Sequence, residues 1–228
     1  YDFMKNFFYL LGILFLVSCG NSTNSAEFVE ATQGRYLFNS DETIEVYYTE
    51  NVLNIKWRGK DITPIKASDS SFYVKDMNEK LIFVAKPEIH IELAPKREHD
   101  GKIYHFTKLG VEKKTPAEYF KNKEYEKAKD GYLAIQRKDS ADRNISQRAI
   151  NQLGYKFMRE KKYEEAKEIF RINIALYPNS SKSYDSMGDA YLKEKDTTKA
   201  LEYYKKALSI NPENRGSKAN VERLTKKK

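Results

Sequence analysis

Two stretches of the sequence, 34 residues apart, carry the same pattern of residue types. Residues 150–157 read INQLGYKF, and residues 184–191 read YDSMGDAY. The same spacing holds farther downstream, so that seven pairs of residues match. The pairs are Ile150 and Tyr184, Leu153 and Met187, Gly154 and Gly188, Phe157 and Tyr191, Ala166 and Ala200, Phe170 and Tyr204, and Pro178 and Pro212. A fixed period of this length predicts stacked helical hairpins, in which each repeat is one supersecondary unit.

The repeated residues have separate physical roles in such a hairpin. Leu153 and Phe157 lie four residues apart and therefore share one face of a first helix. Gly154 allows the two helices to approach closely, and Ala166 is small where the second helix crosses the first. Pro178 ends the second helix, because proline lacks the amide proton that a helix interior needs. The pattern resembles the tetratricopeptide repeat, which runs Trp-x-x-Leu-Gly-x-x-Tyr, then Ala-x-x-x-Phe, then Pro.

An earlier copy of the repeat matches the pattern only in part, and we call it the worn repeat. Tyr119, Ala128 and Tyr132 precede their counterparts in the next copy by 38 residues, so four extra residues lie between the two copies. Its first helix is short and starts at residues 115–118, Thr-Pro-Ala-Glu, which resemble a capping box. The sequence therefore predicts a tetratricopeptide-type array over residues 115–216. It comprises a worn repeat at 115–146, full repeats at 147–180 and 181–214, and a capping helix at 217–228.

The resemblance implies that the first helices line a concave face that binds a partner protein or peptide. Its side chains are Arg148, Asn151, Tyr155 and Arg159 from one repeat and Lys182, Asp185, Asp189 and Lys193 from the next, with Tyr119, Phe120 and Lys121 as further candidates from the worn repeat. Arginine and asparagine side chains can hold a peptide carboxylate or backbone. Asp185 and Asp189 depart from the family's carboxylate-clamp pattern, which has basic and Asn residues in the third repeat. A solvated face without a tight ligand is the alternative.

Residues 34–109 show the alternation that is typical of strands. Ile44 and Val46 alternate with Thr43 and Glu45, and the period of two continues to Phe106. Seven or eight short strands separated by turns predict an antiparallel meander that curls into a small barrel or sandwich. The predicted fold class is two-domain α+β, in which a small antiparallel β-barrel or sandwich precedes an α-helical solenoid.

The β segment resembles the small β-domain appended to some penicillin-binding-protein-like serine hydrolases. The similarity rests on loosely spaced residues, namely Gly34-Arg35-Tyr36, Leu53, Trp57, Pro64, Phe72, Phe83 and Gly101. Those enzymes use a Ser-x-x-Lys nucleophile motif, and this sequence has no serine with a lysine three residues later. The resemblance therefore implies an accessory role beside such a hydrolase. A small-ligand carrier is a further alternative, although a barrel of this size is expected to fill with its own side chains.

The N-terminal residues resemble a bacterial lipoprotein signal. A single lysine, Lys5, precedes an apolar run from Phe7 to Val17, and Ser18-Cys19 follows. Leu16-Val17-Ser18-Cys19 resembles the lipobox, in which the cysteine is acylated, so residues 1–19 are predicted to be a signal peptide. Residues 20–33 are predicted to be a tether, whose first part, 20–25, is polar and flexible. By the same resemblance the chain is expected in the cell envelope, lipid-anchored at the periplasmic face of the outer membrane.

Three short motifs resemble the Asp-Ser/Thr-apolar O-glycosylation motif of exported Bacteroidetes proteins. They are Asp139-Ser140-Ala141, Asp185-Ser186-Met187 and Asp196-Thr197-Thr198. The net charge of +8 comes from the C-terminal half, because residues 109–228 hold 28 basic and 18 acidic residues while residues 27–108 hold 12 and 14. This charge favours either solubility or attraction to an acidic partner. Nucleic acid is not expected as a partner, because the predicted export conflicts with it.

The sequence has none of the common catalytic or phosphate-binding motifs. It lacks Gly-x-Ser-x-Gly, His-Glu-x-x-His, the Gly-x-x-x-x-Gly-Lys loop and a dinucleotide fingerprint. His90 and Glu92 share a strand face, and together with His105 they suggest a metal site, but exposed strand histidines are the favoured interpretation. The sequence therefore predicts a protein-interaction module that is not an enzyme and has no cofactor or metal.

Overall fold

The computed structural model describes residues 23–226. The chain forms two compact units that interleave along the sequence. Of the described residues, the first unit contains 23–33 together with Val46–Ile103, and the second contains Gly34–Glu45 together with 104–226. The segment 34–45 therefore groups with the helices, although the sequence predicts it as part of a separate β-domain.

The strands form two sheets, of four and five strands, in which strand order follows the sequence. They are β1 (Gly34–Asn39), β2 (Glu42–Thr49), β3 (Val52–Trp57), β4 (Lys60–Ile62), β5 (Ile65–Lys66), β6 (Ser71–Val74), β7 (Glu79–Val84), β8 (His90–Leu93) and β9 (His105–Thr107). Neither sheet closes on itself within residues 23–226. The barrel that the sequence suggested is therefore not formed, because a barrel needs its first and last strands to pair.

The first unit has an antiparallel meander from β5 to β8. In β7 and β8, Leu81 lies opposite Leu93 and Phe83 lies opposite Ile91. All four side chains are buried, whereas the residues between them are partly exposed. The alternation predicted from the sequence is thus present in these strands, with one face turned to the core.

The first unit also contains a short helix, α1 (Ala26–Thr32), in the interval expected to be a tether. Ser25 caps it by accepting the amide proton of Phe28, which satisfies one of the free donors at a helix start. The Phe28 ring lies 5.9 Å from Phe72 and 5.4 Å from Phe83, measured between ring centroids. The partly buried Phe28 side chain thus packs α1 against the aromatic residues of the sheet.

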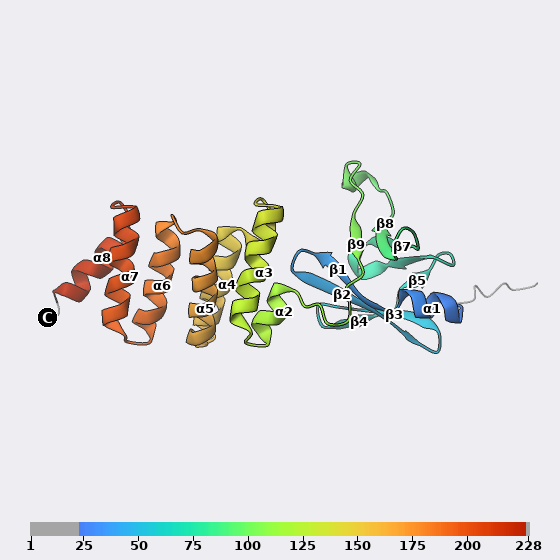
Figure 1. Ribbon diagram of the computed structural model, residues 1–228, viewed down its shortest axis with the longest axis horizontal. Helices are drawn as coiled ribbons and strands as arrows, with labels where there is room; N and C mark the ends of the chain where they lie inside the picture. The colour runs from blue at the N-terminus through green and yellow to red at the C-terminus, as the bar shows by residue number, and fades with distance from the viewer. Residues whose placement is uncertain (1–22, 227–228) are drawn as a thin grey trace, which may run out of the picture. The chain divides into compact units, whose positions relative to one another are not determined.

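The second unit consists mainly of antiparallel helical hairpins that follow one another along the chain (Figure 1). Its helices are α2 (Pro116–Lys121), α3 (Tyr125–Lys138), α4 (Gln147–Arg159), α5 (Tyr163–Leu176), α6 (Ser181–Lys193), α7 (Thr197–Ile210) and α8 (Arg215–Thr225). From α4 to α6 and from α5 to α7 the helix starts are 34 residues apart (181 − 147 and 197 − 163). The helical repeat read from the sequence is therefore present in the structure. Among the described residues no helix is long and apolar enough to cross a bilayer.

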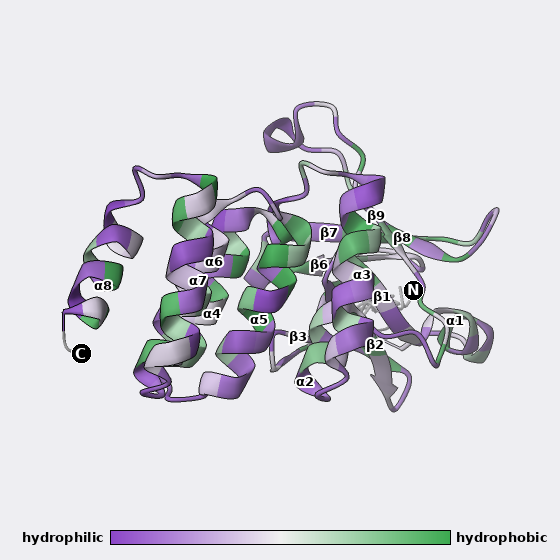
Figure 2. Cartoon of the chain, turned by 60° about the vertical axis from the view of Figure 1, so that its left-hand side comes forward, coloured by the Kyte–Doolittle hydropathy of each residue, from purple (hydrophilic) through white to green (hydrophobic). Residues whose placement is uncertain are grey.

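Close packing inside each hairpin explains the repeated glycines. A Cβ atom on Gly154 would lie 2.3 Å from the Phe170 ring, and one on Gly188 would lie 2.6 Å from the Tyr204 ring. Any larger residue would therefore push the two helices of the hairpin apart. Each helix also has both hydrophilic and hydrophobic residues along its length, as expected when one side faces the core (Figure 2).

The turn between β1 and β2 completes the first hairpin. Helix α2 has 6 residues, whereas α4 and α6 have 13 each. The Tyr132 hydroxyl of α3 and the Ala117 amide of α2 both donate hydrogen bonds to the Asp41 carboxylate, each at 2.7 Å. The side-chain amide of Asn144 donates to Asn39 Oδ1 at 3.2 Å. The turn therefore supplies polar partners at the repeat whose first helix is shortened.

The N-terminal end of α2 is stabilised by a helix cap and by contacts with β1. Thr115 and Glu118 form the capping box that the sequence indicated, with each side chain accepting the other residue's backbone amide proton. Arg35 of β1 forms an ion pair with the Glu118 carboxylate and donates to the carbonyl of Lys113 at 2.9 Å. The packing of β1 on α2 thus depends on a charged pair as well as on the helix cap.

Candidate functional site

Two adjoining cavities lie along the first helices of the second and third repeats. The larger, of about 440 Å³, is lined by residues of α4, α6 and the start of α8, including Asn151, Lys182 and Asp185. The smaller, of about 320 Å³, is lined by α4 and α6 and includes Arg159 and Lys193. Tyr155 lines both cavities, so they adjoin at this side chain. We call the two cavities together the α4–α6 groove.

Seven of the eight side chains expected on the concave face line this groove. They are Asn151, Tyr155, Arg159, Lys182, Asp185, Asp189 and Lys193. Arg148 is exposed near the start of α4 and lines neither cavity. The three- and four-residue spacing brings these groups to one side of each helix, as helical geometry requires.

Asp189 is held by two tyrosines. Tyr155 donates its hydroxyl to Asp189 Oδ2 and Tyr204 donates to Asp189 Oδ1, both at 2.7 Å. Burial raises the pKa of both tyrosines above the usual range for phenols, so they remain protonated donors. Both carboxylate oxygens of Asp189 therefore accept hydrogen bonds from side chains inside the protein.

Asp185 is also engaged within the chain. Ser217 at the start of α8 donates its hydroxyl to Asp185 Oδ1 at 2.5 Å. Burial raises the pKa of the Asp185 carboxyl, which reflects the cost of keeping a charge partly out of water. The two aspartates that break the clamp pattern thus link α6 to neighbouring helices.

The cations of the groove have no such partners. Arg159, Lys182, Lys193 and Arg215 are exposed, and none of them forms an ion pair with a carboxylate within residues 23–226. Glu213, at the edge near α8, is an exposed acidic residue of the groove. The groove therefore presents several positive charges on a surface whose central carboxylates are already hydrogen-bonded.

Sequence reasoning missed the contribution of α8 to this groove. Arg215 and Gly216 line the larger cavity, although the sequence analysis placed them at the end of the array, before a capping helix at 217–228, and not among the binding residues. Helix α8 starts 34 residues after α6 (215 − 181), so it occupies the place of the next repeat's first helix. The period that defined the array was the signal that could have found it.

The candidates from the worn repeat lie elsewhere. Phe120 and Lys121 line a separate cavity of about 300 Å³ beside α2, and Tyr119 is not among its lining residues. Lys114 and Lys127 lie over the Tyr119 ring, each 5.6 Å from its centroid. The structure therefore divides the predicted face into a polar groove and a second, more apolar cavity.

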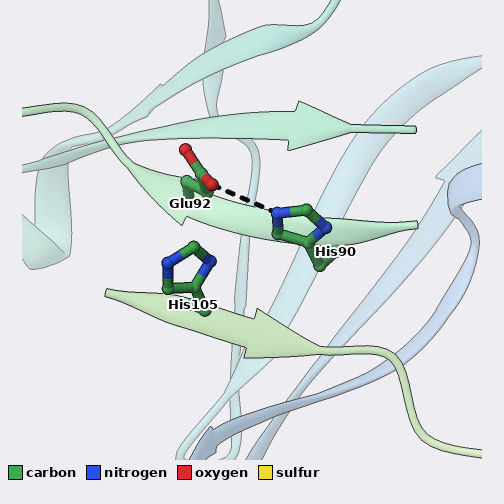
Figure 3. A group of neighbouring side chains, drawn as sticks. All are labelled: His90, Glu92 and His105. Carbon is green, nitrogen blue, oxygen red and sulfur yellow. Dashed lines mark hydrogen bonds and ion pairs between the residues drawn. The ribbon is translucent and has the colours of Figure 1, made fainter. Parts of the chain in front are cut away.

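The strand histidine named from the sequence has local partners. His90 Nδ1 lies 2.8 Å from the carbonyl oxygen of Glu88. His90 Nε2 lies 3.2 Å from Glu92 Oε1, and Figure 3 draws this contact as a dashed line. The hydrogen bond to Glu88, followed by the contact with Glu92, raises the pKa of His90. His105 belongs to the second compact unit.

Comparison with known proteins agrees with the repeat pattern. Residues 186–214 match the family model of the tetratricopeptide repeat. The chain contains a tetratricopeptide repeat. A similar protein is the chloroplastic tetratricopeptide repeat domain-containing protein PYG7 of Arabidopsis thaliana, which is 32% identical over 82 residues. The match covers 36% of this chain and 27% of PYG7, so the chain spans about a quarter of that relative's length.

Solved structures with similarity to part of the chain include two tetratricopeptide domains and PilF. The first repeat domain of Spaghetti (RPAP3), bound to the HSP90 peptide SRMEEVD, is 20% identical, with 49% of this chain and 86% of that chain covered and a TM-score of 0.34. PilF of Pseudomonas aeruginosa is 24% identical, with 49% and 50% covered and a TM-score of 0.34. The Sgt2 domain of Aspergillus fumigatus is 20% identical, with 49% and 73% covered and a TM-score of 0.35.

Proposed function

We propose that this chain is a protein-interaction module that holds an extended, acidic segment of a partner protein in the α4–α6 groove. The observation that supports this proposal is the set of cations without ionic partners, Arg159, Lys182, Lys193 and Arg215. Charges arranged along a groove attract an oppositely charged chain and orient it. Asn151 adds a side chain that can hydrogen-bond to a peptide backbone.

We expect the groove to bind its partner segment with modest affinity. Its charges are solvent-exposed, and exposed ion pairs contribute little each and weaken with salt. The aspartates Asp185 and Asp189 reduce the net positive charge even though their oxygens are hydrogen-bonded. Binding should therefore depend on several weak contacts and fall as ionic strength rises.

The test uses a fluorescein-labelled peptide of alternating Glu and Ser residues, with a Gln and Ser peptide as the reference. Fluorescence anisotropy should show that the double variant Arg159→Glu/Lys193→Glu binds the acidic peptide at least about tenfold more weakly than the wild type. The matched control, Lys138→Glu/Lys205→Glu, makes the same charge change on α3 and α7 and should bind like the wild type. Equal loss in both double variants would show a general charge effect and contradict the proposed site.

The same variants apply to natural partners. Affinity capture of the full chain from membranes should recover a partner with the wild type and with the control, but not with Arg159→Glu/Lys193→Glu. Identical sets of captured proteins for all three would mean that the groove does not select partners. If the captured partner is a penicillin-binding-protein-like serine hydrolase, the result would instead favour the accessory role predicted from residues 34–109.

We also propose that the protein is lipid-anchored in the cell envelope through Cys19. This residue lies outside the described residues, so the proposal is supported by the sequence resemblance to a lipobox. In a bacterial host, metabolic labelling with an alkyne fatty acid should label the wild type and a Ser22→Ala variant but not Cys19→Ser. Label retained on Cys19→Ser would contradict acylation at this position.

A further inference from the structure

The cavity beside α2 is mainly apolar. Phe120 of α2, Tyr125 of α3, and Leu153 and Phe157 of α4 line it, and its volume is about 300 Å³. The Phe120 ring lies 5.0 Å from Tyr125 and 5.6 Å from Phe157, measured between centroids. We call this cavity the first-repeat pocket. Its size is in the range of pockets that take small apolar groups.

A single small residue explains why the pocket is open. Ala117 lines it, and the residue 38 positions later, at the equivalent place in the second repeat, is Tyr155. Asp189 follows after a further 34 positions in the third repeat. The Tyr155 ring packs 5.3 Å from Phe170, measured between centroids, whereas Ala117 contributes only a methyl group to the lining of the first-repeat pocket.

The mouth of the pocket is positively charged. Lys121 and Lys123 are exposed lining residues, and neither forms an ion pair in the part of the chain that the structure describes. Lys162 also lines the pocket and pairs with Glu160 at 2.7 Å, while Glu165 is the acidic lining residue. An apolar group that enters here would therefore best be flanked by acidic residues.

Helix α4 separates the first-repeat pocket from the α4–α6 groove. Leu153 and Phe157 face the pocket, whereas Tyr155 and Arg159 face the groove. A helix with its side chains is roughly 10–12 Å across. An extended chain spans at most about 3.3–3.6 Å per residue, so about three or four residues would cross α4.

We propose that the first-repeat pocket binds one aromatic or long aliphatic side chain of the same acidic partner segment that lies in the α4–α6 groove. The inference rests on the proposed function and adds a specificity site to it. The partner segment then carries acidic residues for the groove and an apolar residue about four positions away for the pocket. Acidic segments without that apolar residue bind less tightly.

The experiment uses defined peptides with the full-length chain. Two fluorescein-labelled peptides each contain a cluster of three Glu residues and one Phe four positions from the cluster. The Phe precedes the cluster in one peptide and follows it in the other. Each peptide has a counterpart with Ala in place of Phe. For one of the two chain directions, the wild-type protein should bind the Phe peptide about tenfold more tightly than the Ala peptide, because the ring leaves water.

A variant that fills the pocket provides the test of location. Ala117→Tyr introduces the residue that the second repeat has at this place, and it should abolish the preference for Phe while leaving binding of the Ala peptide unchanged. Ala134→Tyr, at an exposed position of α3, is the matched control and should keep the preference. If circular dichroism shows that Ala117→Tyr does not fold, the smaller Ala117→Leu takes its place.

The outcomes separate the two proposals. If Phe and Ala peptides bind the wild type equally, and binding still depends on Arg159 and Lys193, the pocket proposal is overturned and the groove proposal stands. If neither peptide binds, both proposals fail. If Ala117→Tyr changes the sedimentation coefficient of the protein without peptide, a second copy of the chain fills the pocket and the peptide proposal is overturned.

Discussion

Asp41 and Asp189 accept hydrogen bonds from equivalent tyrosines in two repeats. Tyr204 donates to Asp189 on the first helix of its own repeat, and Tyr132 donates to Asp41 on the β1–β2 turn, both at 2.7 Å. In the first repeat the position of Asp189 is taken by Ala117, whose amide donates to Asp41. Asp41 therefore provides from a strand turn the acceptor that the third repeat has on its own helix.

Asp41 should make the stability of the second unit depend on pH. Burial raises the pKa of the Asp41 carboxyl to about 6, whereas the unfolded chain has a value of about 3.9. The folded state therefore binds more protons between these values, so this contribution to stability is full below about pH 4 and is lost as the pH rises through about 6. Between about pH 4 and 7, the wild type should lose roughly 1–3 kcal/mol more unfolding free energy than Asp41→Asn.

Urea unfolding at several pH values measures this difference. Asp130→Asn, an exposed substitution on α3, is the control and should follow the wild type at every pH. An Asp41→Asn variant whose stability has the same pH dependence as the wild type would show that Asp41 is not responsible. The Asn side chain keeps one acceptor oxygen for Tyr132, so the variant is expected to fold.

The turns inside the three hairpins share an unusual backbone conformation. Lys123, Lys161 and Lys195 have φ angles of 62°, 60° and 67°, and they recur at spacings of 38 and 34 residues. The left-handed region costs a residue with a Cβ atom about 1–2 kcal/mol, whereas glycine enters it freely. Each hairpin therefore contains a lysine in a conformation that glycine would adopt at lower cost.

Replacing the turn lysine of the third repeat should stabilise the protein. Lys195→Gly relieves the left-handed conformation, and after the entropy lost by glycine is subtracted we expect a gain of about 0.5–1 kcal/mol. The control is the same substitution inside a helix, Lys205→Gly on α7, which should lose about 1 kcal/mol. Urea unfolding followed by circular dichroism measures both, and a loss of equal size in the two variants would refute the explanation.

The contact of the β1–β2 turn with α2 and α3 should control the stability of the first hairpin. A fragment of residues 110–228 lacks Asn39 and Asp41, so Tyr132 and Asn144 lose their acceptors. Because each repeat of such an array contacts mainly its neighbours, the effect should stay near that end. Amide protons of α2 and α3 should exchange at least about tenfold faster in the fragment, while those of α6 and α7 keep their rates.

Hydrogen exchange measured by mass spectrometry distinguishes a local loss of stability in α2 and α3 from a general loss of stability. The full-length Asp41→Ala variant should show part of the same change, restricted to α2 and α3, because it removes an acceptor from the buried Tyr132 hydroxyl. Faster exchange in α6 and α7 as well would mean that the array unfolds as one unit. Unchanged exchange in α2 would mean that the turn does not support the first hairpin.

The helical repeats were predictable because their requirements are local. Gly154, Phe170 and Pro178 each follow from packing or helix termination within one hairpin, and the same needs recur 34 residues later. The strand pattern was predictable for the same reason, since Phe83 and Ile91 alternate with less buried neighbours. Whether a sheet closes into a barrel is decided by pairing between strands that are distant in the sequence. The strand pattern did not contain this information, so the suggested barrel was wrong.

The sequence by itself determined the period of the array, the helix pairs and seven of the residues that line the α4–α6 groove. The tertiary structure alone decided which charges in the groove are free to act on a ligand, because Asp189 and Asp185 are engaged by Tyr155, Tyr204 and Ser217 across helices. It also decided that Asp41 completes a helical repeat from 91 residues away. Contacts over such distances leave no periodic signal in the chain, because they depend on how separate elements pack and not on the spacing within one element.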